Sequence, residues 1–347
     1  MQRVKWFSIV LAALVFLTAC GEDTTTSTQG GSVRTGAVDS AGVTTAEDTG
    51  SQAAETPERS NPVTAQDSQV PMTSYEGGGG YIAPAFATAE YHPALAQGTD
   101  QVHLDLSALS QGYVAVSANS DKRLKFQVVC GELTYNYDLD ADGTPWIYPL
   151  QCGSGEYRFR VMENVAESRY AELYAETCQV NLTDEFTPFV RPSSYVNYSQ
   201  DSSCVKKAQE LAAQAADAVG VVANVYSYVC QSVIYDQQKA ASVQSGYLPV
   251  PDHTLQSGKG ICFDYAALAA AMLRSQGIPT KMVFGYVSPN DLYHAWNMFY
   301  TRETGWVTVN FQVSGGSWNR LDLTFSASGA DSTFIGDGSN YTDLYFY

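Results

Sequence analysis

A glycine-rich turn followed by an alanine-rich run places a cysteine at the start of a helix in the last third of the chain. The stretch Gly258–Leu268 has the sequence GKGICFDYAAL, and residues 266–274 are almost all strong helix formers. Gly277 and Pro279 predict the end of this helix. Cys262 therefore lies at or just before the first helical turn, where unpaired N–H groups and the helix dipole favour a thiolate. The alternative is that Cys262 is a small buried apolar residue, as free cysteines usually are.

Two polar residues that could act on this thiol follow in segments that are typical of strands. His294 comes after the β-rich run Lys281–Val287, and Asn310 ends the run Trp306–Asn310. A histidine could take the thiol proton, and an asparagine could hold the imidazole in one tautomer and orientation. The chain order therefore predicts a Cys262-His294-Asn310 triad.

The motif G-x-C-x-D-Y-A-x-L…L-R-x-x-G-I-P…G-Y…H-A-W…W-x-x-V-N, between about Tyr235 and Phe311, resembles the core of the bacterial transglutaminase-like superfamily. The resemblance implies a papain-like cysteine fold, with Cys262 as nucleophile and His294 as base and acid. The third residue is usually Asp in this superfamily and is Asn310 here, as in papain-like proteases. Gln256 precedes Cys262 by the offset of their oxyanion-hole glutamine, although a plain loop amide is the alternative. The resemblance implies no cofactor and no metal.

The start of the chain has the layout of a secretory signal. Arg3 and Lys5 precede the apolar run Trp6–Leu17, which is too short to span a membrane. The following Leu-Thr-Ala-Cys resembles a bacterial lipoprotein site, which implies a signal peptide over 1–19 and lipidation of Cys20; an ordinary signal peptide is the alternative. Residues 20–80 are rich in Thr, Ser and Gly, which predicts a disordered tether. We therefore expect an extracytoplasmic protein, lipid-anchored to the bacterial cell membrane.

The remaining chain is long enough for two domains, which gives an α+β protein overall. Residues from about 100 to 198 alternate apolar and polar positions between turn signals, which predicts a β-sandwich-like domain of six to eight strands over residues 81–198. Residues 199–347 are predicted to form the transglutaminase-like α+β domain. The run Asp138–Gly143 resembles a calcium loop, but its twelfth position would be Pro149 where Glu is required, so we interpret it as a polar hairpin turn.

Cysteine spacing indicates two disulfides, which extracytoplasmic conditions permit. Cys130 and Cys152 flank the predicted turn near residue 141, so an antiparallel hairpin would place them opposite each other. Cys204 and Cys230 are similarly spaced about the expected bend of a helix pair. Cys178 is then left as a free thiol.

The expected chemistry is attack of the Cys262 thiolate on an amide carbonyl of a protein or peptide, giving a thioester. Water as acceptor makes the protein a peptidase or amidase, and a lysine amine makes it a cross-linking transglutaminase. We favour hydrolysis slightly, because water is always present in an open extracellular cleft. A catalytically inert papain-like binding module is the alternative. The formal net charge of −17 argues against nucleic-acid partners. The expected location outside the cell makes a cell-wall or extracellular protein or peptide one possible substrate.

Overall fold

The computed structural model describes residues 80–289, 291–303, 305–308, 311–328 and 338–347. By its internal contacts the chain divides into Met1–Gly42 and Val43–Tyr347, and all described residues belong to the second unit. The predicted signal peptide, Cys20 and nearly all of the predicted tether lie outside the described residues. Among the helices of the described part, none is long and apolar enough to cross a membrane.

The first half of the described chain is built from eight strands in two antiparallel four-stranded sheets, with orders β1-β2-β3-β6 and β5-β4-β7-β8. The strands are β1 (Gln97–Gly98), β2 (Val102–Asp105), β3 (Tyr113–Ala118), β4 (Leu124–Cys130), β5 (Leu133–Leu139), β6 (Trp146–Pro149), β7 (Gly155–Ala166) and β8 (Arg169–Val180), with 3-10 helices η1 (Leu109–Gln111) and η2 (Thr187–Phe189). The apolar faces of the sheets meet, since the rings of Phe126 and Tyr148 lie 4.7 Å apart across them. The predicted sandwich is confirmed.

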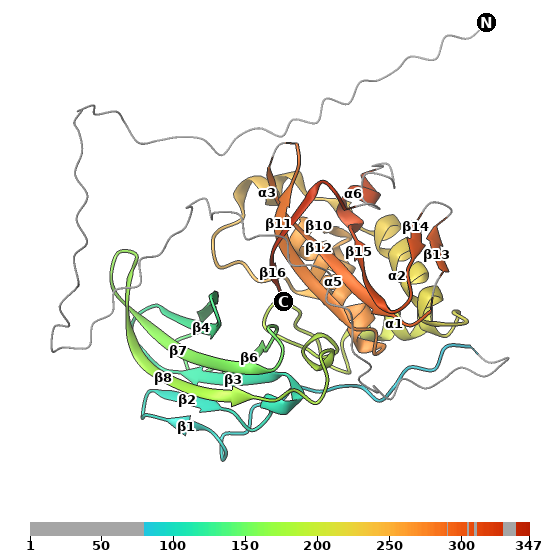
Figure 1. Ribbon diagram of the computed structural model, residues 1–347. Coiled ribbons are helices and arrows are strands. Elements are labelled where there is room, and N and C mark those ends of the chain that lie inside the picture. The colour runs from blue at the N-terminus through green and yellow to red at the C-terminus, as the bar shows by residue number, and fades with distance from the viewer. Residues whose placement is uncertain (1–79, 290, 304, 309–310, 329–337) are drawn as a thin grey trace, which may run out of the picture. The chain divides into compact units, whose positions relative to one another are not determined.

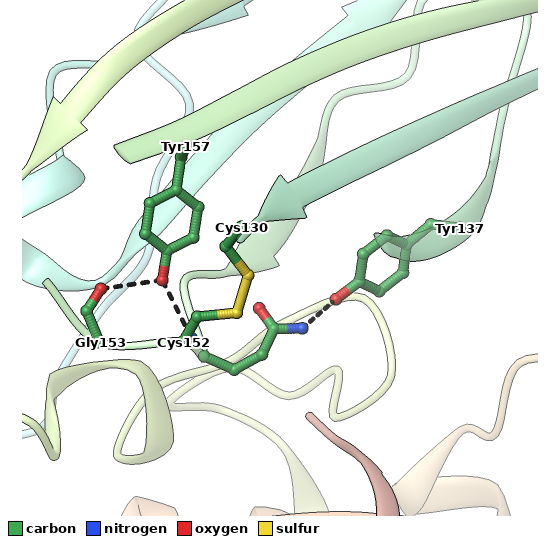
Figure 2. Close-up of a disulfide and its surroundings, with 6 residues drawn as sticks. Cys130, Tyr137, Cys152, Gly153 and Tyr157 are labelled. Atoms are coloured by element: carbon green, nitrogen blue, oxygen red, sulfur yellow. Dashed lines mark hydrogen bonds between the residues drawn. A yellow bond between two sulfur atoms is a disulfide. The ribbon is translucent and has the colours of Figure 1, made fainter. Parts of the chain in front are cut away.

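The expected Cys130–Cys152 disulfide is present, but the hairpin that led us to expect it is not (Figure 2). Strand β4 turns directly into β5, and β6 pairs with β3 in the other sheet. The bridge therefore joins the end of β4 to the turn between β6 and β7 rather than the two arms of one hairpin. The hydroxyl of Tyr157 lies beside it, accepting from the N–H of Cys152 at 3.0 Å and donating to the carbonyl of Gly153 at 2.9 Å.

The second half of the described chain combines helices with a four-stranded antiparallel sheet of order β15-β12-β11-β16 (Figure 1). Its helices are α1 (Ser203–Ala212), α2 (Ala218–Ser232), α3 (Gln237–Ser242), α4 (Pro251–Ser257), α5 (Cys262–Ser275) and α6 (Leu323–Ala327). Its strands are β9 (Ile234–Tyr235), β10 (Lys259–Gly260), β11 (Thr280–Val287), β12 (Leu292–Thr301), β13 (Gly305–Thr308), β14 (Phe311–Val313), β15 (Ser317–Leu321) and β16 (Tyr341–Phe346). The fold class predicted from the sequence is confirmed.

Helix α5 is the buried centre of this half. Every residue from Asp264 to Ser275 is buried, because α1, α2 and α4 pack around the helix and β11 and β12 pack against it. Its alanines give these neighbours room to approach closely. The helix ends where predicted, since Gly277 adopts a left-handed backbone with φ of +77°. Cys262 is its first residue, as the sequence indicates.

The expected Cys204–Cys230 disulfide is wrong, because both residues are free thiols. Cys204 is buried near the start of α1, where its backbone N–H donates to Asp252 of α4 at 2.8 Å. Cys230 lies near the end of α2 with its Sγ 3.7 Å from the carbonyl oxygen of Leu323. The equal sequence distance of the two cysteines from the bend between the helices did not predict a bond, because side-chain direction also depends on each helix's rotation about its axis. Cys178 is free, as expected.

Candidate active site

The first turn of α5 is held by a hydrogen bond between its N-cap and its third residue. The N–H of Ile261 donates to Asp264 Oδ2 at 2.8 Å, so this donor at the helix start is satisfied. A Cβ on Gly260 would lie 2.6 Å from Asp264 Cβ, which explains the glycine. Cys262 is partly exposed, and its N–H belongs to the turn whose donors have no acceptor within the helix. The thiol and the backbone N–H of Cys262 therefore lie together at the start of α5.

Asp264 is fully buried and is neutralised by a lysine. Lys239 of α3 places Nζ 2.7 Å from Asp264 Oδ2, and the hydroxyl of Tyr247 donates to Oδ1 at 2.5 Å. Without Lys239 this carboxylate would oppose a negative charge on Cys262, two residues away. The same contacts attach α3 and the loop between α3 and α4 to the start of α5.

His294 lies on β12, where it is 4% exposed and pairs across the sheet with Gly285 of β11. Its Nε2 lies 2.9 Å from Asp322 Oδ2, and the Cys262 side chain is close enough to contribute to raising the pKa of the ring. Because Nε2 faces Asp322, Nδ1 is the nitrogen left for Cys262. The structure therefore brings together Cys262 and His294, the first two members of the predicted triad.

Asp322 is the residue that sequence reasoning missed. It directly follows β15, whose Leu321 pairs with Asn297 of β12, and this register carries Asp322 to the β12 segment that bears His294. Its Oδ1 accepts from the N–H of Phe325 at 3.0 Å, which caps α6, and its Oδ2 accepts from the hydroxyl of Tyr341 at 3.0 Å. The carboxylate is 1% exposed and fixed on both oxygens.

Among the described residues, Asp322 lies at the imidazole in the position that we expected for Asn310. Asn310 itself lies outside the described residues, so its expected role stays a prediction. A signal was present in the sequence, because the superfamily pattern asks for Asp as the third residue and position 310 departs from it.

The surroundings of His294 favour its charged form. Burial lowers the pKa of His294, but the charge and hydrogen bond of Asp322 and the contact with Cys262 raise it, with a net value of about 10. The imidazole is therefore protonated at neutral pH. Phe325 stacks on the ring at 4.5 Å between centroids, and Trp296 lies at 6.1 Å. Together they keep water from the imidazole–carboxylate pair.

A buried amide ties the two catalytic elements together. Asn297 of β12 is fully buried, and its Nδ2 donates to the carbonyl oxygen of Ala266 in α5 at 3.0 Å. This contact fixes the strand that carries His294 against the helix that carries Cys262.

The remaining candidate, Gln256, is exposed on α4, and its predicted oxyanion role stays a prediction. Two tyrosines that we did not single out lie near the thiol. Burial and the charge of Cys262 both contribute to raising the pKa of Tyr235 and of Tyr293 to about 12.

A helix-borne cysteine with a strand-borne histidine and a buried carboxylate is the arrangement used by thiol-dependent acyl-transfer enzymes. Residues 205–311 match the family model of the transglutaminase-like superfamily, so the chain contains a transglutaminase-like domain. No curated protein sequence matches the chain.

Several solved structures are similar to parts of the chain. A putative cysteine protease from Cytophaga hutchinsonii has 16% identity and a TM-score of 0.37, over 73% of each chain. Calcium-bound LapG from Legionella pneumophila has 17% identity and a TM-score of 0.27, over 41% of this chain and 83% of that one. Red sea bream transglutaminase has 14% identity and a TM-score of 0.25, over 61% of this chain and 48% of that one.

Proposed function

We propose that the protein is a transglutaminase-like cysteine peptidase or amidase that acts on amide bonds of proteins or peptides through a Cys262 thioester. The observation that carries this proposal is the position of His294, buried between Cys262 and Asp322. The pairing with Asp322 orients the imidazole, and the raised pKa keeps it charged beside the thiol.

The first half of the reaction transfers the acyl group to sulfur. The Cys262 thiolate attacks the amide carbonyl, and negative charge moves onto the carbonyl oxygen. The N–H groups of the first turn of α5 are positioned to stabilise that oxygen. As the C–N bond breaks, His294 gives its proton to the leaving amine, and a C–S bond remains as the thioester.

The second half releases the acyl group. Neutral His294 takes a proton from the incoming nucleophile, which attacks the thioester carbonyl, and the C–S bond breaks to restore the thiolate. Water as nucleophile yields a carboxylic acid, whereas a lysine amine yields an isopeptide bond. We favour water as the nucleophile, because water is always present in an open extracellular cleft.

The proposal includes the location of the protein. A signal peptide over 1–19 and lipidation of Cys20 would anchor the domain outside the bacterial cell membrane, with substrates in the wall or the medium. The basic-then-apolar start of the chain and the Leu-Thr-Ala-Cys sequence support this part.

The experiment compares thiols within one protein. Iodoacetamide at pH 6–7 should label Cys262 far faster than Cys178, a free thiol whose pKa is raised by burial and by Glu176. His294→Ala should remove most of that advantage, and an amide library should leave a thioester adduct detectable by mass spectrometry. If Cys262 labels slowly and is indifferent to loss of His294, the proposal fails and the inert binding module becomes the better account.

A further inference from the structure

A cavity of about 480 Å³ is lined by chain neighbours of Cys262 and His294, although these two residues do not line it themselves. Its wall includes Phe263, which follows Cys262, and Tyr293, which precedes His294. Cys262 is close enough to Tyr293 to contribute to raising the pKa of the Tyr293 hydroxyl. Its volume is in the range of ligand pockets rather than of packing defects. The other lining residues come from β4 and β5, from the loop before α4, and from buried aromatic positions: Arg123, Lys125, Asn136, Tyr137, Asp138, Tyr195, Ser245, Gly246, Tyr247, Leu248, Phe284 and Tyr347.

The floor of this cavity is aromatic. Phe263 lies edge-to-face with Phe284 at 5.0 Å and with Tyr195 at 5.4 Å between ring centroids, and Phe284 stacks with Tyr293 at 6.0 Å. Tyr293 is 54% exposed, so its ring is open to a ligand. Such a floor favours a planar apolar group, which can add further stacked or edge-to-face contacts.

One wall of the cavity is the outer edge of a strand. Asn136, Tyr137 and Asp138 are consecutive in β5 and all line the cavity, although their side chains alternate between the faces of the sheet. Within the described part of the chain, β5 pairs with β4 alone. An extended peptide can form backbone hydrogen bonds to such an edge while its side chains enter adjacent pockets.

The charges on this wall are opposite in sign to the charge of the whole chain. Arg123 and Lys125 contribute two positive charges, and Asp138, which accepts from Arg123 at 2.7 Å, contributes one negative charge. Arg123 and Asp138 form an ion pair, so the charge beyond this pair is that of Lys125. The Nζ of Lys125 also lies 5.0 Å from the ring centroid of Tyr170 in β8. The charge of Lys125 should attract a carboxylate and repel an ammonium group.

The opposite wall is fixed to the catalytic helix. Tyr247, in the loop that supplies Ser245–Leu248 to the cavity, donates to Asp264 in the first turn of α5. This hydrogen bond connects the cavity wall to the helical turn that begins with Cys262.

We propose that this cavity is a substrate-recognition subsite that takes an aromatic side chain of an extended polypeptide and prefers an acidic neighbour in the same peptide. The inference rests on the proposed function and names its substrate class. The peptide would lie along the edge of β5, with its reactive carbonyl at Cys262 and its aromatic side chain on the floor.

The first test measures how fast Cys262 is alkylated by tetrapeptide chloromethyl ketones of alanine in which each position in turn is replaced by phenylalanine. At one position phenylalanine should accelerate alkylation by about 10- to 100-fold, the discrimination that apolar pockets provide. Ser245→Trp, at the cavity wall, should abolish that gain. Gln244→Trp is the matched control, since it is the exposed neighbouring residue and does not line the cavity. Equal rates for all peptides, or equal effects of the two variants, overturn the inference.

The second test addresses charge. With phenylalanine at the preferred position, a neighbouring glutamate should react faster than a neighbouring lysine, and Lys125→Glu should reverse that order. Lys122→Glu makes the same charge change outside the cavity and should leave the order intact. Iodoacetamide labelling of every variant separates the two proposals. Fast, His294-dependent labelling without peptide preference refutes the subsite alone, whereas slow labelling refutes the catalytic thiol.

Discussion

Asp322 Oδ2 lies 2.9 Å from His294 Nε2, and both side chains are almost completely shielded from solvent. A buried charged pair of this kind is strongly destabilised when one partner is lost, because the other charge remains uncompensated. The same pair orients the only base placed beside Cys262 in the described part of the site. Asp322 therefore affects both the stability and the proposed chemistry.

Asp322→Asn should lower turnover by about 10²- to 10⁴-fold, since an amide of the same shape no longer fixes the imidazole tautomer or its charge. Asn310→Ala should retain most activity. Steady-state kinetics on the peptide identified by thioester trapping would measure both, with circular dichroism to confirm folding. The reverse ranking would restore Asn310 to the triad and reduce Asp322 to a helix cap.

The sequence predicted α5, β11 and β12 well, because local signals specify each of them. Helix formers followed by Gly277 define α5, and runs of Val, Phe and Tyr define the strands. Cys262 and His294 could be assigned because each lies at a marked position within such an element.

The third site residue could not be predicted from local signals, because its position depends on strand pairing. Nothing near Asp322 in the sequence shows that β15 will pair with β12, and Asn310 lies nearer to His294 along the chain. The disulfide predictions were limited in the same way, because they too depend on how distant segments pack. Cys130–Cys152 was right although its hairpin was wrong, and Cys204–Cys230 failed because the rotation of a helix is set by packing.

Protein stability should decline at alkaline pH through His294. Its folded pKa of about 10 is raised above the ordinary value of 6.5, so the pairing stabilises the fold fully below pH 6.5 and is lost as the pH rises through 10. We expect the free energy of unfolding to fall by on the order of a few kcal/mol over this interval. Urea midpoints at pH 6, 8 and 10 would measure it. The decline should be smaller in Asp322→Asn; an equal decline would assign it to other groups.

Only one of the two expected disulfides should be found in solution. Alkylation in denaturant without reductant should modify Cys178, Cys204 and Cys230 and leave Cys130 and Cys152 protected. Replacing both bridged cysteines by serine should cost about 2–4 kcal/mol of stability, since the bridge closes a loop with a sequence separation of 22 residues. Cys178→Ser is the control and should change stability by less than about 0.5–1 kcal/mol. Protection of Cys204 and Cys230 would reinstate the second bridge.

Membrane anchoring should depend on Cys20. Cys20→Ser should move the protein from the membrane fraction to the medium, or leave its signal peptide uncleaved, because the acyl chains can no longer be attached. Fractionation and the intact mass of the mature N-terminus measure this. Wild-type protein that carries no lipid mass would remove the lipoprotein assignment and leave the catalytic proposal untouched.

Gly260 should be required for both stability and reactivity. A methyl group there would lie 2.6 Å from Asp264 Cβ, within the turn that holds Cys262, so either the backbone or Asp264 must move. We expect Gly260→Ala to cost about 1–3 kcal/mol of stability and to slow alkylation of Cys262, since the hydrogen bond from Ile261 to Asp264 is disturbed. Chemical denaturation and iodoacetamide labelling measure the two effects.

Gly155→Ala is the matched control for this prediction, because a Cβ at Gly155 meets no atom within 4 Å. It should leave stability and labelling close to those of the wild type. If Gly260→Ala behaves in the same way, the close approach between Gly260 and Asp264 does not constrain the helix start. If it loses stability but keeps wild-type labelling, Asp264 supports the fold without positioning Cys262. The expected combination, loss of both, would show that the contact that starts α5 also sets the thiol in place.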